Sequence, residues 1–158
     1  AQIAHTVLCL LTRPDLLARA LADPALLPGI VEETLRYSPS VTMTMTRVAT
    51  TDIDLGGVRI RAFDQVAAAI PLANRDEMAF TGADRFENGR TTNRHLTFGY
   101  GTHHCLGAHL ARVEIQIAVA VLLSRAPQLC LAVPVADLGW SVSPTMRSLT
   151  ALPVRWRP

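Results

Sequence analysis

Residues 98–107 read FGYGTHHCLG and place one cysteine, Cys105, behind a glycine-rich stretch. Gly99 and Gly101 can adopt backbone angles that are closed to other residues, so this segment can fold tightly beneath a flat ligand. Cys105 precedes a predicted helix, and the free amides and positive dipole at a helix start stabilise a thiolate. The pattern therefore predicts an iron-binding thiolate whose sulfur is shielded from water by Phe98.

The helix after this cysteine is predicted from its apolar residues. From Leu106 onward they recur in steps of three and four, the spacing of one helix face, and the pattern continues to about Arg125. The apolar stripe comprises Leu106, Leu110, Val113, Ile117 and Val121. Gly107 would let a flat ligand approach the first turn of this helix closely.

Two other interpretations of the cysteine are open at this point. A free cysteine is often no more than a small buried hydrophobe. The second alternative is zinc, because Cys105 and His109 have the i, i+4 spacing of two ligands on one helix. The full zinc set would be His103, His104, Cys105 and His109. Three consecutive residues rarely converge on one tetrahedral ion, which argues against zinc.

The segment from Phe98 to Glu114 resembles the haem-binding signature of the cytochrome P450 family. Each fixed position of F-x-G-x-G-x-H-x-C-x-G is filled in order, and Leu-Ala-Arg follows at residues 110–112. The resemblance implies a haem b cofactor (iron protoporphyrin IX) with Cys105 as its axial ligand and as the catalytic residue. The residues implied to surround this cofactor are Phe98, Gly99, Gly101, His103 and Gly107.

A second motif lies upstream, where Glu33 and Arg36 are three residues apart in EETLRYSP, residues 32–39. Taken alone this is an ordinary surface ion pair of little energetic worth. Together with the cysteine segment it resembles the buried Glu-x-x-Arg pair that braces the haem-binding loop in the family. The family adds a third arginine before a phenylalanine, and the resemblance assigns this role to Arg85, with Arg90 as the alternative.

Further contacts are implied by position. Arg47 resembles the arginine that pairs with a haem propionate, to which its fork geometry is suited, and His103 resembles the histidine that meets a propionate from the opposite side. A solvated strand residue is an equal alternative for Arg47. Two segments correspond to the family regions that reach over the haem, and they predict substrate contacts from Met43, Thr44, Thr145 and Met146. Alternatively, Met43 and Met45 lie on opposite faces of a strand, one of them in the core.

The predicted elements are mainly helical. Helices are expected at residues 1–11, 14–23 and 28–37, a hairpin at 48–60 with its turn at Gly56 and Gly57, and a buried strand at 65–70. Residues 74–104 lack periodicity and predict a functional loop, and 129–133 and 152–156 predict a small C-terminal sheet. The fold class is mainly α with small β-sheets, and the resemblance makes residues 1–158 the C-terminal, haem-ligating portion of a single cytochrome P450 domain.

Two positions depart from the family's pattern. Residues 60–64, IRAFD, stand where a proline and a glycine commonly form a tight turn, and Phe63 cannot adopt a glycine conformation cheaply. Ser148 replaces a common glycine near the last substrate-contacting loop. The turn at Phe63 is therefore in question, but neither change affects the iron ligand.

Composition limits the class of protein. The 158 residues are 49% hydrophobic with a net charge of +2, and the fifteen basic residues are all arginine without clustering into a nucleic-acid-binding stripe. No apolar run is long enough to span a membrane. Three cysteines without paired spacing favour a reducing compartment, with Cys9 and Cys130 as core residues. We expect a soluble, cytoplasmic protein that binds neither nucleic acid nor membrane, and the resemblance, through the Glu-Glu-x-Leu-Arg form of the ion pair and the short helices, implies a bacterial member of the family.

The resemblance implies a monooxygenase that activates O₂ and inserts one oxygen atom into a small apolar substrate. Its electrons would come from NAD(P)H through a ferredoxin or flavodoxin, which docks on the proximal face where Arg112 and Arg94 would form a basic patch. A solvated helix face is the alternative for Arg112. The family's acid–threonine pair is expected upstream of Ala1, so the chain is expected to be an inactive fragment when isolated. The alternatives are a haem-thiolate protein that uses peroxide or does not turn over, and a truncated gene product.

Overall fold

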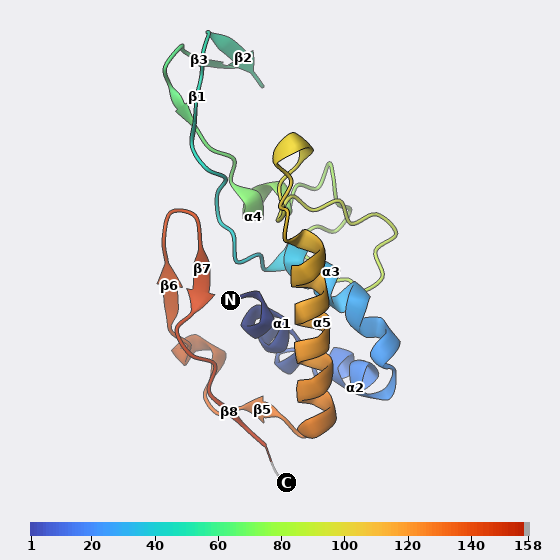
Figure 1. The fold of residues 1–158 in the computed structure, drawn as a ribbon. Helices are drawn as coiled ribbons and strands as arrows, with labels where there is room; N and C mark the ends of the chain where they lie inside the picture. Colours follow the sequence, from blue (N-terminus) through green and yellow to red (C-terminus); the bar gives the residue numbers. More distant parts are fainter. Residues whose placement is uncertain (157–158) are drawn as a thin grey trace.

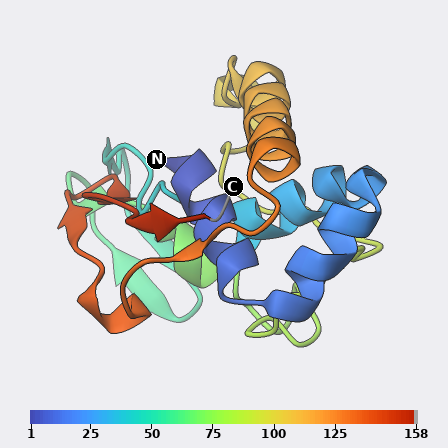
Figure 2. The same ribbon diagram turned by 90° about the horizontal axis from the view of Figure 1, so that it is seen from below.

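A helical body forms the centre of the computed structural model, which describes residues 1–156. It consists of α1 (Gln2–Leu11), α2 (Pro14–Ala22), α3 (Leu27–Tyr37) and the long α5 (Ala108–Arg125). The helix α1 lies at the centre of this body, where it packs against α2, α3 and α5, and α5 also packs against α3 (Figures 1 and 2). Apolar side chains from all four helices form one core, in which Ile30, Val31 and Val119 have no exposed surface. Burial of such side chains is the main stabilising contribution to this body.

Small antiparallel sheets, each made of two strands, lie to one side of the helical body (Figure 2). The pairs are β1 (Arg47–Val48) with β4 (Gln65–Val66), β2 (Ile53–Leu55) with β3 (Val58–Ile60), β5 (Cys130–Leu131) with β8 (Val154–Arg155), and β6 (Trp140–Val142) with β7 (Arg147–Leu149). The β2–β3 hairpin projects from the end of the molecule opposite the C-terminus (Figure 1). Short helical turns complete the fold: α4 (Ile70–Ala73), η1 (Pro24–Leu26), η2 (Gly101–His103) and η3 (Val135–Asp137).

The fold class and most of the elements expected from the sequence are confirmed. The hairpin turns at Gly56 and Gly57, with Leu55 paired to Val58 across it. The buried strand expected at residues 65–70 is wrong, because its strand covers only Gln65–Val66, is exposed, and gives way to α4. The β6–β7 hairpin was not expected. Cys9 is buried as predicted, whereas Cys130 is exposed on β5.

The face that α5 buries is the opposite of the one that its most regular apolar stripe suggests. Leu106 is fully exposed, and Leu110, Val113, Ile117 and Val121 are between 44% and 63% exposed. The side chains that α5 buries are Ala108, Ile115, Val119 and Leu123. The helix is apolar on two sides, so periodicity alone could not select the buried one.

The unusual turn at Phe63 keeps a glycine-like backbone without a glycine. Phe63 has a φ of 71°, while its amide donates a 2.8 Å hydrogen bond to Ala49 and its ring is 82% exposed. A side chain in this left-handed region costs about 1 kcal/mol or more. The exposed ring offers little packing in return.

Replacing Phe63 with glycine is therefore expected to stabilise the intact protein by about 1 kcal/mol, less the entropy that glycine gains in the unfolded chain. Urea unfolding measures the difference. Phe63→Ala is the matched control, since it removes the ring but keeps the backbone penalty. Equal stabilisation by alanine would assign the effect to the ring instead.

Candidate functional site

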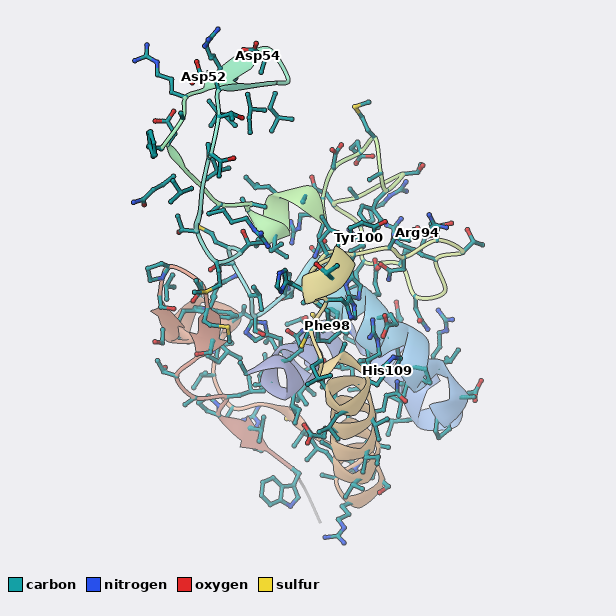
Figure 3. All side chains as sticks on the ribbon, turned by 45° about the horizontal axis from the view of Figure 1, so that its top comes forward. Asp52, Asp54, Arg94, Phe98, Tyr100 and His109 are labelled. Carbon is teal, nitrogen blue, oxygen red and sulfur yellow. The ribbon has the colours of Figure 1, made fainter. Side chains whose placement is uncertain are left out.

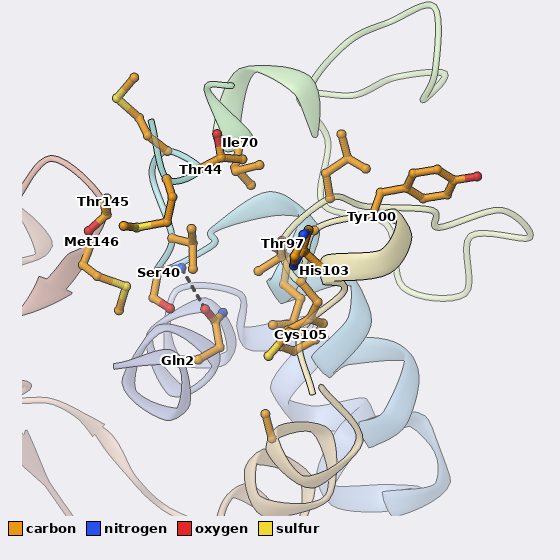
Figure 4. A pocket seen from close by; sticks show the side chains of 18 of the residues that line it. Gln2, Ser40, Thr44, Ile70, Thr97, Tyr100, His103, Cys105, Thr145 and Met146 are labelled. Atoms are coloured by element: carbon orange, nitrogen blue, oxygen red, sulfur yellow. Dashed lines mark hydrogen bonds between the residues drawn. The ribbon is translucent and has the colours of Figure 1, made fainter. Parts of the chain in front are cut away.

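A cavity of about 550 Å³ lies between the helical body and the segment that carries Cys105. Its mostly apolar walls come from Gln2 of α1, the end of α3, Ile70 of α4, residues 40–47 and the first turns of α5. Figure 4 shows Cys105 and His103 on one wall and Thr145 and Met146 on the opposite one. Cavities that hold drug-sized ligands or cofactors have volumes of about 300–1,000 Å³ and a similar apolar lining.

The cysteine loop is held by its own backbone. The amide of Cys105 donates a 2.8 Å hydrogen bond to the carbonyl of Phe98, and the amide of His104 donates to Gly101 at 3.0 Å. Gly99 and Gly101 have φ values of 75° and 80°, so the reversal of the loop uses the left-handed region at both glycines. The helix α5 begins at Ala108 rather than at Leu106 as expected, which leaves Cys105 just before its first turn.

The residues predicted to contact haem divide into two groups. Phe98, Gly99, His103, Cys105 and Arg47 line the cavity, whereas Gly101 and Gly107 do not. Arg47 lies on β1 and is exposed on the cavity side of the sheet, which suits either interpretation of this residue. A Cβ atom added to Gly107 would lie 3.9 Å from the sulfur of Cys105, an ordinary contact distance.

All four predicted substrate residues, Met43, Thr44, Thr145 and Met146, line the same cavity. Their two segments are joined, because the amide of Thr42 donates to the carbonyl of Thr145 at 3.0 Å and Val41 pairs with Met146. Met43 and Met45 are 38% and 79% exposed, so neither lies in the core. These flexible apolar side chains form a wall that adapts to ligands of irregular shape.

Glu33 and Arg36 form a fully buried ion pair with two short contacts, Nε to Oε2 at 2.8 Å and Nη2 to Oε1 at 2.7 Å. Arg36 also donates to the carbonyls of Asn74 and Ala83, both at 2.8 Å, and of Arg85 at 2.9 Å. All five N–H donors of the guanidinium are thus used. Burial alone would raise the pKa of Glu33, but the hydrogen bonds from Arg36 and its neighbours hold that pKa below its ordinary value.

The third arginine of this network is Arg90, so the assignment of Arg85 was wrong for its side chain. Arg90 Nε lies 3.1 Å from Oε1 of Glu33, and its side chain is 7% exposed. Arg85 contributes only its carbonyl, while its guanidinium folds back beside Gly82 and the residue is exposed. The chain reverses through Gly89, whose φ is 89°, and this turn brings Arg90 back to the carboxylate.

Asn74 connects the ion pair to the cysteine loop and was missed by the sequence analysis. It is fully buried, its Oδ1 accepts from the amide of Leu96 at 2.7 Å, and its Nδ2 donates to Oγ1 of Thr97 at 3.0 Å. Thr97 in turn donates to the carbonyl of Leu35 at 2.6 Å. An asparagine after an apolar run is typical of an ordinary turn, so only the three-dimensional contacts reveal this role.

Arg112 is not the free surface cation that a docking role requires. It forms a bidentate ion pair with Glu32 of α3, at 2.6 Å from Nε to Oε1 and 3.1 Å from Nη2 to Oε2. Its side chain is 26% exposed. Arg94 is exposed in the loop before Phe98 and, within residues 1–156, has no acidic partner (Figure 3). Of the two predicted docking residues, Arg94 therefore carries the uncompensated charge.

The zinc alternative gains no support from the geometry. Within the described part of the chain, no three His, Cys, Asp or Glu side chains are grouped closely enough to share a metal ion. His109 lies on the first turn of α5 and is exposed (Figure 3). None of the helices in residues 1–156 has the length and apolarity needed to cross a membrane.

Comparison with known proteins agrees with the geometry. The sequence pattern described as Cytochrome P450 matches residues 17–126. The mycinamicin IV hydroxylase/epoxidase of Micromonospora griseorubida is 47% identical over 156 residues, which cover 98% of this chain and 39% of the relative. The biotin biosynthesis cytochrome P450 of Bacillus subtilis strain 168 is 46% identical, over 96% of this chain and 38% of its own length.

The structural comparison gives the same result. The tirandamycin C-bound P450 monooxygenase TamI has a TM-score of 0.95 at 39% identity, and the match covers 99% of this chain and 39% of that one. The chain thus spans 38–39% of the length of these relatives. The chain that carries this cysteine loop and the buried ion pair behind it therefore belongs to the cytochrome P450 family.

Proposed function

We propose that the intact protein containing these residues is a haem-dependent monooxygenase and that Cys105 is the ligand of the haem iron. The observation that carries this proposal is the position of Cys105, on the wall of an apolar cavity of about 550 Å³ and at the end of a loop closed by two glycines with positive φ. The residues fit the cofactor, since a flat apolar ring requires apolar walls and its carboxylates require cationic partners.

When bound, haem would supply the activation of O₂ and the insertion of one oxygen atom into the substrate, with electrons that originate from NAD(P)H. The residues of this chain would bind and orient that cofactor. Cys105 would hold the iron, and Arg47 and His103 on the cavity wall would bind the two propionates. The buried Glu33–Arg36 pair would keep the cysteine loop in place.

The substrate is proposed to be a small apolar organic molecule. Met43, Thr44, Thr145 and Met146 would contact it, because they line the cavity opposite Cys105. Relatives of similar identity have names or bound ligands as different as mycinamicin IV, tirandamycin C and a fatty acid on an acyl carrier protein. Identity of this degree therefore does not select one compound for this chain.

Electrons are proposed to arrive from a cytoplasmic ferredoxin or flavodoxin that docks near the cysteine loop. Arg94 is the predicted docking residue that the structure leaves exposed and uncompensated among residues 1–156. An acidic partner would be attracted to such a surface, and the attraction would weaken with salt.

The intact protein, loaded with haem, tests this function directly. With ferredoxin, its reductase and NADPH, we expect consumption of O₂ coupled to hydroxylation or epoxidation of an apolar substrate. Product detection by mass spectrometry after incubation with ¹⁸O₂ measures this outcome, because one labelled oxygen atom must appear in the product. Haem binding without labelled product from a broad panel of apolar compounds would contradict the monooxygenase assignment.

A further inference from the structure

Glu32, next to the buried Glu33 on α3, holds two side chains from distant parts of the chain. Its Oε1 lies 2.6 Å from Nε of Arg112 on α5, and its Oε2 lies 3.3 Å from Nε2 of His95. The side chain of His95 is 2% exposed, and those of Arg112 and Glu32 are 26% and 30% exposed. Glu32 thus joins α3, α5 and the loop that leads into the cysteine segment, although it does not line the cavity.

The two partners of Glu32 both lie against the ring of Phe98. The guanidinium carbon of Arg112 is 4.6 Å from the centroid of this ring, and the centroid of the His95 ring is 6.0 Å from it. Cation–π and aromatic contacts of this kind are attractive and depend on orientation. Both partners of Glu32 are therefore among the contacts of the Phe98 ring, together with the ring of His104, whose centroid is 6.4 Å away.

The backbone of Phe98 is in turn hydrogen-bonded to that of Cys105. Its carbonyl accepts the 2.8 Å hydrogen bond from the amide of Cys105, and both residues line the cavity. Cys105 is itself exposed among the described residues, so the contact that links it to Phe98 is this backbone hydrogen bond, and a shift of Phe98 is expected to move the hydrogen-bonded end of the cysteine loop. Groups around a metal ligand of this kind tune its orientation and its exposure to solvent.

We propose that Glu32 is a positioning residue for the iron-ligating thiolate of Cys105 and that it acts through the ring of Phe98. This inference rests on the proposed function, since it presupposes that Cys105 binds haem iron. Glu32 orients the partners of the ring and makes no contact of its own with the cavity. Its role differs from that of the neighbouring Glu33, which holds the buried arginines behind the loop.

The negative charge of Glu32 is what holds Arg112 in this arrangement. Burial alone would raise its pKa, but the hydrogen bonds from His95 and Arg112 outweigh burial and hold the pKa at about 2. The carboxylate is therefore ionised at neutral pH. Among residues 1–156, Glu32 is the only acidic side chain paired with Arg112. Glutamine at this position keeps the size of the side chain but removes the charge and one of the two acceptor oxygens, and so weakens the hold on Arg112 beside the ring.

The test uses the intact, haem-loaded protein with Glu32→Gln. We expect a smaller proportion of the ferrous carbon monoxide complex in the red-shifted band of thiolate ligation, and a several-fold faster loss of that band with time. Asp84→Asn is the matched control. Asp84 also pairs with an arginine, Arg75, at 3.2 Å, and the guanidinium carbon of Arg75 lies 4.3 Å from the ring centroid of Tyr37. This control is expected to keep the parental band.

A second set of variants tests the route through the ring. Arg112→Gln is expected to reproduce the loss, and in a Phe98→Leu background Glu32→Gln is expected to cause no further loss. A Glu32→Gln protein with the parental band and only a lower melting temperature would overturn the inference, as would additive effects of Glu32→Gln and Phe98→Leu. A parent protein without the thiolate band would instead overturn the proposed function, and this inference would fail with it.

Discussion

Replacement of Cys105 with alanine is expected to abolish the red-shifted ferrous carbon monoxide band of the intact protein completely. That band requires a thiolate on the iron, and alanine has no atom that can bind it. The apolar cavity and its cationic residues would remain, so some haem is expected to stay bound without the sulfur ligand. Carbon monoxide difference spectra, normalised to haem content, measure the loss.

Cys130→Ala provides the control for this experiment. Cys130 is also an exposed cysteine, but it lies on β5, where its sulfur is 3.4 Å from Nε of Arg155. Removal of this thiol is expected to leave the band unchanged. A Cys105→Ala protein that retains the band would show that another residue binds the iron.

The cysteine loop was predictable from sequence because its determinants are local. Two glycines at fixed positions before Cys105 dictate the backbone of the loop, and both adopt the positive φ that other residues avoid. The start of α5 was less certain, since a helix boundary depends on its final hydrogen bonds. The prediction placed it at Leu106, and the structure places it at Ala108.

The contacts behind the loop could not be derived from spacing in the chain. Arg85 and Arg90 both lie in a segment without periodicity, and the choice between them depends on a reversal at Gly89. The hydrogen bond between Asn74 and the amide of Leu96 joins residues near the two ends of the loop at residues 74–104. Contacts between residues so far apart depend on the path of the whole chain, which single-residue preferences do not specify.

The buried face of α5 was unpredictable for a different reason. Both Val121 and Val119 belong to apolar rows on this helix, but Val121 is 44% exposed and Val119 is fully buried. A periodic pattern reports that a face is apolar and does not report which neighbour covers it. Packing against α1 and α3 therefore decides which face of α5 is buried. The apolar pattern of α5 carries no information on where those two helices lie.

Among substitutions at residues other than Cys105, Arg36→Ala is expected to lower the free energy of unfolding most. Arg36 is fully buried with all its donors used, and its removal leaves the carboxylate of Glu33 buried beside only Arg90, a backbone amide and Asn93. Breaking a buried ion pair in this way costs about 3 to 5 kcal/mol. A typical domain has roughly 5 to 15 kcal/mol of stability in total. We therefore expect a much lower melting temperature and poor retention of haem, although Arg36 does not line the cavity.

Arg59→Ala is the matched control, because Arg59 pairs with Asp52 at the same 2.7 Å distance that joins Arg36 to Glu33. That pair lies on the projecting hairpin, where the two side chains are 63% and 48% exposed. Water and salt weaken such a pair, so Arg59→Ala is expected to change unfolding and haem content little. Because the two ion pairs have the same N–O distance, any difference between the two substitutions reports the effect of burial. Equal effects of the two substitutions would mean that the pair on α3 contributes no more than a surface pair, and the cysteine loop would then be held by its backbone and by Asn74 alone.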